Sequence, residues 1–315
     1  MLDYIIKRSA RGILVIFIII LFSFFIIHMM PGDPVMTMLG DKATPEQINS
    51  MRKELNLDKP LIEQFLTWIF GFIKLDMGNS LIWQEPVIDI IISRIEPTLI
   101  LALMATMISV IIGVPVGIKA SREHNMIFDK FFSVASLVSI SLPAFWIAII
   151  FIHILGVKIN LFPVAGYRNI ESAGLLISIY DLMLPSIVLG VMHSGQIARM
   201  TRTQMIDILQ QDYLKTARAK GLSENKVIHI HAFINALSSI IMVVSFGFAA
   251  LLGGAAVIEQ IFNIPGTGNL VITAVNNRDY PLIQGVLLFI GTIFVFTNMF
   301  VDILCTLINP RTRFE

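Results

Sequence analysis

The segment RMTRTQMIDILQQDYLKTARAKGLSENKVIHIHAFIN, residues 199–235, is a polar stretch between two long apolar ones. It carries six lysines and arginines. The whole chain of 315 residues is 56% hydrophobic and only 14% charged, with a mean hydropathy of +0.79. Soluble domains carry about 25% charged residues. We therefore expect the apolar stretches to cross a membrane and residues 199–235 to form a basic loop at the membrane surface.

Six windows come close to the roughly 20 apolar residues that a membrane-spanning helix needs. They are residues 12–30, 97–118, 131–155, 182–197, 237–258 and 282–308. The fourth is the shortest and contains Pro185 and His193, which a helix tolerates when it packs among other helices. The sequence predicts an all-α polytopic membrane protein with six transmembrane helices.

Lysine and arginine placement predicts the orientation of these helices. The basic residues concentrate at both termini, between the second and third windows, and in residues 199–235. The short loops 156–181 and 259–281 carry only Lys158, Arg168 and Arg278. Cytoplasmic loops are the ones enriched in these residues, so both termini and residues 199–235 are expected in the cytoplasm. The first window lacks a small-x-small cleavage site, which predicts an uncleaved helix and not a signal peptide.

Residues 31–96 form one long segment on the other side of the membrane. Its middle, residues 44–75, has a helical pattern that starts at Thr44 with Pro45 in the first helical position. Leu61, Phe65, Trp68, Ile69 and Phe72 follow at helical spacing. Two interpretations fit this pattern: a cap over the outer mouth of the bundle, or a surface helix in a solvated linker.

Motifs for covalent chemistry are absent from the sequence. It contains no G-x-x-x-x-G-K-[ST] phosphate loop, no H-E-x-x-H and no G-x-S-x-G elbow. Cys305 is the only cysteine, and His229 and His231, two positions apart, point to different faces of a helix. We expect no catalytic residue, no metal site and no cofactor in this chain, and no nucleic-acid partner. Any energy for transport must come from outside it.

Residues 199–235 are expected to form two helices with a break. The first helix would run from Met205 to Lys220, and Gly221 would end it. Ser223 can cap a second helix that runs through Val227 to Phe233. A solvated loop is the simpler interpretation, but an ordered helix pair of this kind favours a docking surface for a soluble partner.

A family resemblance supports the docking interpretation. Asp212-Tyr213-Leu214-Lys215-Thr216-Ala217-Arg218-Ala219-Lys220-Gly221-Leu222-Ser223 resembles the signature loop of ABC-importer permeases, and more narrowly that of the B-type permease subunit of oligopeptide and dipeptide importers. Four further regions resemble this family in the same order: residues 30–34 (MPGDP), residues 55–61 with 76–80 (LNLDKPL, DMGNS), residues 264–268 with 278–281 (IPGTG, RDYP), and residues 309–313 (NPRTR). Together they extend over essentially the whole chain. Lys215 replaces a glutamate common in the broader family, and Ser238 replaces a proline, which leaves the entry angle of the fifth span open.

The resemblance implies a type I importer fold with residues 1–94 as the first helix and outer segment, 95–308 as the transmembrane domain, and 309–315 as a cytoplasmic tail. It implies that a short helix docks on a cytoplasmic ATPase. The docking residues would be Thr216, Ala217, Arg218, Ala219, Lys220, Gly221, Leu222 and Ser223. Arg218 and Lys220 would pair with acids of the ATPase.

The implied partners are a second homologous permease, two ATPase subunits that bind ATP and magnesium, an extracytoplasmic substrate-binding protein, and membrane lipid, in a bacterial or archaeal cell membrane. Leu142-Pro143 and the second to fifth spans would line the path. Peptide is the expected cargo, with nickel or a metal–chelator complex as the alternative. A self-contained channel or secondary transporter and a passive scaffold are the alternatives from other classes.

Overall fold

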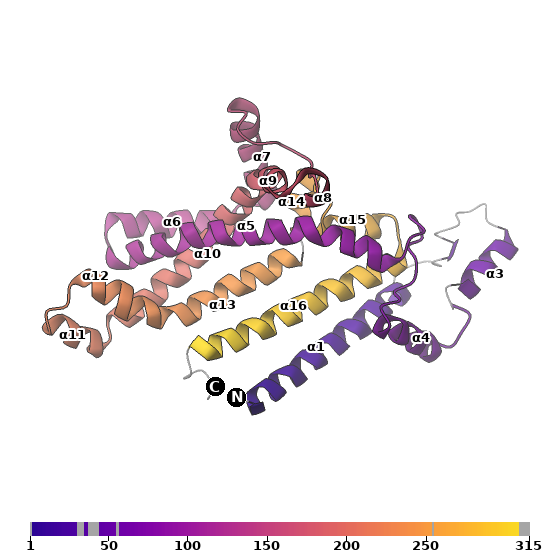
Figure 1. Cartoon of the computed structure of the whole chain (residues 1–315), viewed down its shortest axis with the longest axis horizontal. Helices are drawn as coiled ribbons and strands as arrows, with labels where there is room; N and C mark the ends of the chain where they lie inside the picture. The colour runs from indigo at the N-terminus through magenta and orange to yellow at the C-terminus, as the bar shows by residue number, and fades with distance from the viewer. Residues whose placement is uncertain (1, 30–34, 37–43, 55–56, 254, 309–315) are drawn as a thin grey trace.

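The computed structural model describes residues 2–29, 35–36, 44–54, 57–253 and 255–308. Throughout this part of the chain every regular element is a helix, as the sequence predicts, and the long helices pack into a bundle (Figure 1). The motifs at residues 30–34 and 309–313, and residues 55–56 of the outer motif, lie outside the described residues. The helices are α1 (Leu2–Met29), α3 (Pro45–Glu54), α4 (Leu61–Ile73), α5 (Val87–Arg122), α6 (Ile127–Ser141), α7 (Ala144–Phe151), α8 (Ile170–Ala173), α9 (Leu175–Asp181), α10 (Met183–Leu209), α11 (Asp212–Ala219), α12 (Glu224–Lys226), α13 (Phe233–Leu252), α14 (Ala256–Ile261), α15 (Thr267–Asn276) and α16 (Tyr280–Ile308), with π-helical segments at Ile152–Lys158 and Val227–Ala232.

Four of the described helices are long and apolar enough to cross a membrane, and two bent pairs bring the number to six when each pair is one span. The pairs are α6 with α7, bent by 103°, and α9 with α10, bent by 56°. The third window, residues 131–155, is therefore broken and not one straight helix. Leu142 at the break has an extended ψ of 134°, because the proline at 143 disfavours a helical conformation in the residue before it.

Glycine brings α5 and α10 into close contact, and these two helices form the most extensive helix pair. A Cβ added to Gly117 of α5 would lie 2.5 Å from the carbonyl oxygen of Ala198, and one added to Gly113 would lie 2.8 Å from that of Ser194. Small residues four positions apart commonly allow such close backbone approach between membrane helices. The helix that continues into residues 199–235 is thus held directly against α5.

The remaining spans extend the bundle from α10 to α13, then α16, then α1 (Figure 1). The α5–α6 connection and the α11–α12 region lie at one end of the bundle, and α3, α4 and α15 lie at the opposite end (Figure 1). The two basic connections predicted to share one side of the membrane therefore do lie together. The fifth span ends at Leu252, six residues before the predicted end of its window, and the short helices α14 and α15 follow it.

A buried carboxylate orders the connection that contains α14 and α15. Glu259 is fully buried and accepts hydrogen bonds from Thr98 Oγ1 on α5 and from the backbone N–H of Asn269, both at 2.8 Å. Asn269 lies in the first turn of α15, where a carboxylate satisfies a free N–H and complements the helix dipole. A Cβ on Gly266 would lie 2.3 Å from this carboxylate. The glycine of the Pro265-Gly266 motif therefore has a packing explanation.

The segment after the first span forms two helices, α3 and α4, and not one continuous helix over residues 44–75. The predicted start at Thr44 is confirmed: its Oγ1 accepts from the N–H of Gln47 at 3.3 Å, and Gln47 Oε1 accepts from the N–H of Thr44 at 2.9 Å. This reciprocal pair is a capping box. Farther along, the buried Asp279 accepts from Ser80 Oγ at 2.5 Å and from the N–H of Leu81 at 3.1 Å, which ties this segment to the start of α16.

Candidate functional site

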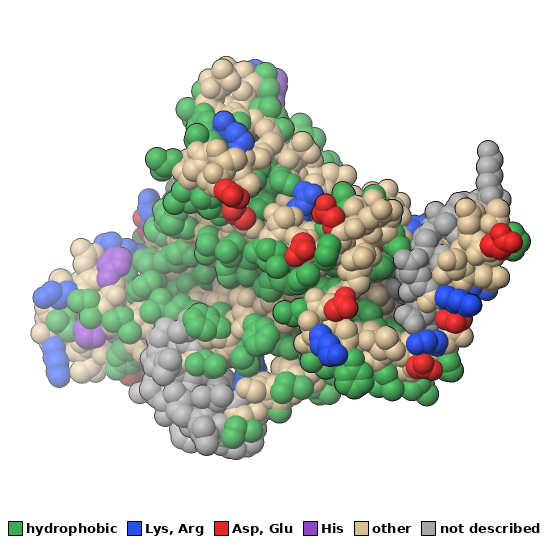
Figure 2. Space-filling view, turned by 45° about the vertical axis from the view of Figure 1, so that its right-hand side comes forward, with side chains coloured by type: hydrophobic (Ala, Val, Ile, Leu, Met, Phe, Trp, Pro, Cys, Tyr) green, Lys and Arg blue, Asp and Glu red, His purple; other side chains and the backbone are tan. Residues whose placement is uncertain are grey.

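Residues 212–232, which we term the basic hairpin, contain α11, a turn at Gly221, α12 and the second π-helical segment. The hairpin lies at one end of the molecule (Figure 1), and Figure 2 shows lysine, arginine and histidine side chains gathered at that end. The predicted helix from Met205 to Lys220 is instead two helices, with a break at residues 210–211. Met205 and Leu214 are both fully buried in the same apolar cluster. At about 100° per residue a continuous helix would put them roughly 180° apart, so only a break buries both.

The turn at Gly221 closes α11 in a well-defined way. Gly221 has φ +80°; its N–H donates to Arg218 O at 2.9 Å, and the N–H of Leu222 donates to Ala217 O at 3.3 Å. This pair of bonds is the Schellman motif, in which a left-handed residue, usually glycine, ends a helix. Ala217 and Leu222 also pack against the same apolar cluster, which is the apolar contact that accompanies the motif. The prediction that Gly221 ends the helix is confirmed.

An ion pair bridges the two arms of the hairpin across this turn. Arg218 Nη2 donates to Glu224 Oε1 at 2.9 Å and Arg218 Nε donates to Glu224 Oε2 at 3.1 Å. The hydrogen bond to Glu224 raises the pKa of Arg218, so this side chain stays charged. The structure thus pairs Arg218 within the chain, whereas the sequence interpretation had given it to an acid of a partner. Ser223 begins the second arm as predicted, although its side chain makes no capping hydrogen bond.

The predicted docking residues divide between two faces of the hairpin. The inner face packs on a cluster built around the fully or nearly fully buried Leu214, Val227 and Ile228. Of the eight predicted residues, Ala217 and Leu222 contribute to this face. The exposed ones are Thr216, Ala219, Lys220, Gly221 and Ser223. The surface that a partner can contact is therefore small and basic, with Lys220 as its exposed charge.

A charged cluster that the sequence analysis did not identify holds the hairpin's entry helix to the neighbouring connection. Arg202 on α10 forms an ion pair with Asp129 on α6, with Nη2 and Oδ2 2.7 Å apart. Asp129 also accepts from the N–H of Asn125 at 2.9 Å, and His124 Nδ1 lies 3.3 Å from it. The Asp129 side chain is only 3% exposed. The available signal was weak, because Asp129 is one of two acids, with Glu123, among the basic residues of the second-to-third connection.

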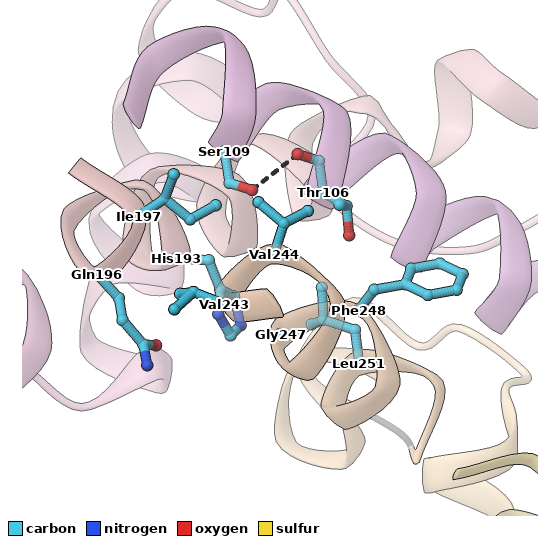
Figure 3. A pocket seen from close by; sticks show the side chains of 10 residues that line it. All are labelled: Thr106, Ser109, His193, Gln196, Ile197, Val243, Val244, Gly247, Phe248 and Leu251. Carbon is cyan, nitrogen blue, oxygen red and sulfur yellow. Dashed lines mark hydrogen bonds between the residues drawn. The ribbon is translucent and has the colours of Figure 1, made fainter. Parts of the chain in front are cut away.

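A small, mostly apolar pocket lies between α5, α10 and α13, the second, fourth and fifth spans (Figure 3). Its cavity volume is only about 10 Å³. His193 and Gln196 of α10 line it together with Thr106 and Ser109 of α5. His193 lies where α10 meets α13, with its Nδ1 3.7 Å from a Cβ built on Gly247.

The described part of the chain holds no group of three or more histidine, cysteine, aspartate or glutamate residues that could bind a metal ion. The contacts described at the hairpin are those of apolar packing and of one ion pair. The chemistry of the hairpin is that of a contact surface.

The comparisons with known proteins agree with this architecture. The family described as binding-protein-dependent transport system inner membrane component matches residues 109–314, and the N-terminal region of such membrane components matches residues 1–102. A Brucella abortus (strain 2308) protein that bears the name of a peptide transport system permease is 39% identical over 311 residues, which cover 99% of each chain. The dipeptide transport system permease protein DppB of Escherichia coli K12 is 35% identical over 336 residues, again with 99% of each chain covered.

Solved structures show the same fold. A chain in inward-facing crystal structures of the MetNI methionine ABC transporter matches 70% of this chain and 96% of its own length, with 15% identity and TM-scores of 0.55 and 0.58 in two crystal forms. The fold predicted from the sequence, that of a type I ABC-importer permease, is confirmed.

Proposed function

This chain belongs to the binding-protein-dependent transport system inner membrane component family, and from that premise we propose that it is the permease subunit of an ATP-driven importer of short peptides. Peptide cargo is supported by the relatives, which carry the names of peptide and dipeptide permeases over nearly their full length. In this proposal the chain does no covalent chemistry. ATP and magnesium bind to partner subunits, and the permease provides half of the path.

The basic hairpin is the proposed docking element for a cytoplasmic ATPase. The observation that carries this assignment is the Schellman turn at Gly221, which presents residues 216–223 at the end of the bundle while a buried apolar cluster holds the hairpin to the spans. Leu214 on the inner face is fully buried in that cluster, so a displacement of the hairpin by the ATPase would also move the spans packed against it. Lys220 supplies an exposed charge for an acid of the partner.

The remaining assembly follows from the same proposal. Two ATPase subunits lie below the permease pair, both termini of this chain lie in the cytoplasm, and a second homologous permease completes the path. An extracytoplasmic binding protein docks on the opposite end, over residues 31–96 and 259–281. The pocket lined by His193 lies between three of the spans proposed to line the path. ATP binding closes the ATPase pair and rocks the spans between outward- and inward-facing states.

Charge reversal on the hairpin tests the docking assignment. Lys220→Glu in the complete transporter, reconstituted with its ATPase and binding protein, should abolish dipeptide uptake and its coupling to ATP hydrolysis. Lys130→Glu is the matched control, because Lys130 is an exposed lysine in the neighbouring α5–α6 region, outside the hairpin. If both variants transport equally well, the hairpin is not the docking element.

Arg218 needs a different design because it already pairs with Glu224. The single change Arg218→Glu would place two acids across the turn and distort the hairpin. The swapped pair Arg218→Glu with Glu224→Arg keeps an ion pair between the arms. Near-normal transport in the swapped pair, with loss in the single variant, is the expected result if Arg218 acts within the chain.

Three alternatives give other results. Uptake of nickel or a metal–chelator complex, with no dipeptide uptake, would retain the architecture and change the cargo. Dipeptide flux through the purified chain alone in liposomes, without an ATPase, would identify a channel or secondary transporter. Normal transport in a Gly221→Arg variant would favour a passive scaffold.

A further inference from the structure

The helix α4 (Leu61–Ile73) has an apolar surface larger than its contacts with the rest of the chain require. It is 13 residues long, and none of its residues is fully buried. At about 100° per residue, its side chains fall into three sectors around the axis. One sector faces the protein, one is apolar and exposed, and the third is polar.

The protein-facing sector places α4 at the end of the first span. The rings of Phe65 and Trp68 lie 5.2 and 5.9 Å from that of Phe24 on α1, and Phe72 packs against the cluster formed by the start of α5 and the start of α16. Phe24 lies in the last turn of the apolar window of α1, which ends at Phe25. The α4 helix therefore lies at the level where the first span leaves the apolar layer.

The exposed apolar sector lies beside the protein-facing one. Ile62 is 75% exposed, Phe70 59% and Ile73 68%, and Leu66 lies between them at 45%. These four side chains fall within an arc of roughly 80°. The polar sector contains Glu63, Gln64 and Thr67 and covers an arc of roughly 100°.

The exposed sector continues the exposed apolar surface of α1. Phe22 and Phe25, close to Phe24, are 61% and 44% exposed, on a helix that is apolar enough to cross a membrane. Lys59 and Lys74 flank α4 at its two ends. Lysines at such positions keep their charge at the headgroups while their stems cover apolar surface.

We propose that α4 lies in the plane of the membrane interface and inserts the sector of Ile62, Leu66, Phe70 and Ile73 among lipid acyl chains, at the end of α1 opposite Arg8. Phenylalanine and aliphatic side chains on one face, polar residues on another and flanking lysines are features of helices that lie at a membrane interface. The occupant of this sector is lipid, and the binding protein proposed to dock over residues 31–96 contacts other residues of that segment. This inference goes beyond the proposed transport function and does not depend on it.

Nitroxide labels on cysteine variants test the placement of α4. The full transporter, in a Cys305→Ser background, is placed in nanodiscs of phosphatidylethanolamine and phosphatidylglycerol. Labels at Ile62→Cys and Phe70→Cys report the exposed sector, and Thr67→Cys is the matched control on the polar sector of the same helix. Phe22→Cys on α1 and the exposed Asn49→Cys on α3 are the lipid and water references.

The measured quantity is the ratio of collision with oxygen to collision with a water-soluble nickel chelate. We expect the ratio at positions 62 and 70 to match that of the lipid reference, and the ratio at 67 to shift toward that of the water reference. Ratios at 62 and 70 equal to the water reference would overturn the proposal. Labels there that are immobile and shielded from both reagents would also overturn it, because they would identify a protein neighbour.

Discussion

Replacement of Gly221 by alanine isolates the contribution of the left-handed turn in the basic hairpin. Gly221 has φ +80°, and a Cβ built on it would meet no atom within 4 Å. Crowding by neighbours therefore adds nothing, and the cost is that of the backbone conformation alone, about 1–2 kcal/mol for a residue with a Cβ. Since 1.4 kcal/mol corresponds to tenfold in an equilibrium constant, Gly221→Ala should weaken ATPase binding by roughly 5- to 30-fold.

The assay is the affinity of the purified ATPase subunit for the full permease in nanodiscs, measured for three variants. Gly221→Asn is the matched control, because asparagine adopts left-handed conformations more readily than other residues with a Cβ. We expect affinity to fall from glycine to asparagine to alanine, with Gly221→Val the weakest because a β-branched side chain is an outlier at positive φ. Equal affinity of wild type and the alanine variant would refute the reasoning, and so would a larger loss for asparagine than for alanine.

The remaining predictions concern stability in detergent. Gly117→Ala and Gly247→Ala add the same helix propensity, but the Cβ would lie 2.5 Å from a backbone oxygen at position 117 and 3.7 Å from its nearest neighbour at position 247. The free energy of unfolding in mixed micelles should therefore be lower for Gly117→Ala by about 1–3 kcal/mol. Equal values would contradict the close α5–α10 contact. In Glu259→Gln, the side-chain NH₂ would face one of the two donors that the carboxylate oxygens satisfy, Thr98 Oγ1 and the N–H of Asn269. This should cost about 1–3 kcal/mol of stability and lower the melting temperature. An unchanged melting temperature would argue against the buried network. Arg202→Ala removes the guanidinium that pairs with the carboxylate of Asp129, which is 3% exposed, and should cost about 3 kcal/mol of stability. Arg202→Lys should have an intermediate stability. Identical melting temperatures of the wild type and both variants would show that the pair does not stabilise the fold.

Apolar length was sufficient to predict the number of spans, but not their shape. The third window was broken by Pro143, whose effect on Leu142 is local and visible in sequence. The size of the bend, 103°, depends on what α7 packs against, and composition carries no such information. The break at residues 210–211 could not be predicted for a similar reason. Met205 and Leu214 are buried in the same apolar cluster, and that contact is visible only in the three-dimensional structure.

The turn of the hairpin was correctly predicted because its signal is local. Gly221 after a helical stretch predicts a left-handed end, and the structure has one. The partner of Arg218 could not be predicted in the same way, since Glu224 lies six positions away on the other arm, and only the turn brings the two side chains within 2.9 Å. The Asp129–Arg202 pair joins residues 73 positions apart and was equally out of reach of local patterns.

The continuity between the hairpin and the fifth span has a mechanical consequence. From Glu224 to Leu252 the chain forms one helical rod of 29 residues, with the π-helical segment inside it. At about 1.5 Å per residue this rod is roughly 43 Å long, so a tilt of about 10° around its middle moves each end by roughly 4 Å in opposite directions. A displacement of the basic end of the rod therefore produces an equal displacement in the opposite direction at its far end, beside α14 and the buried Glu259.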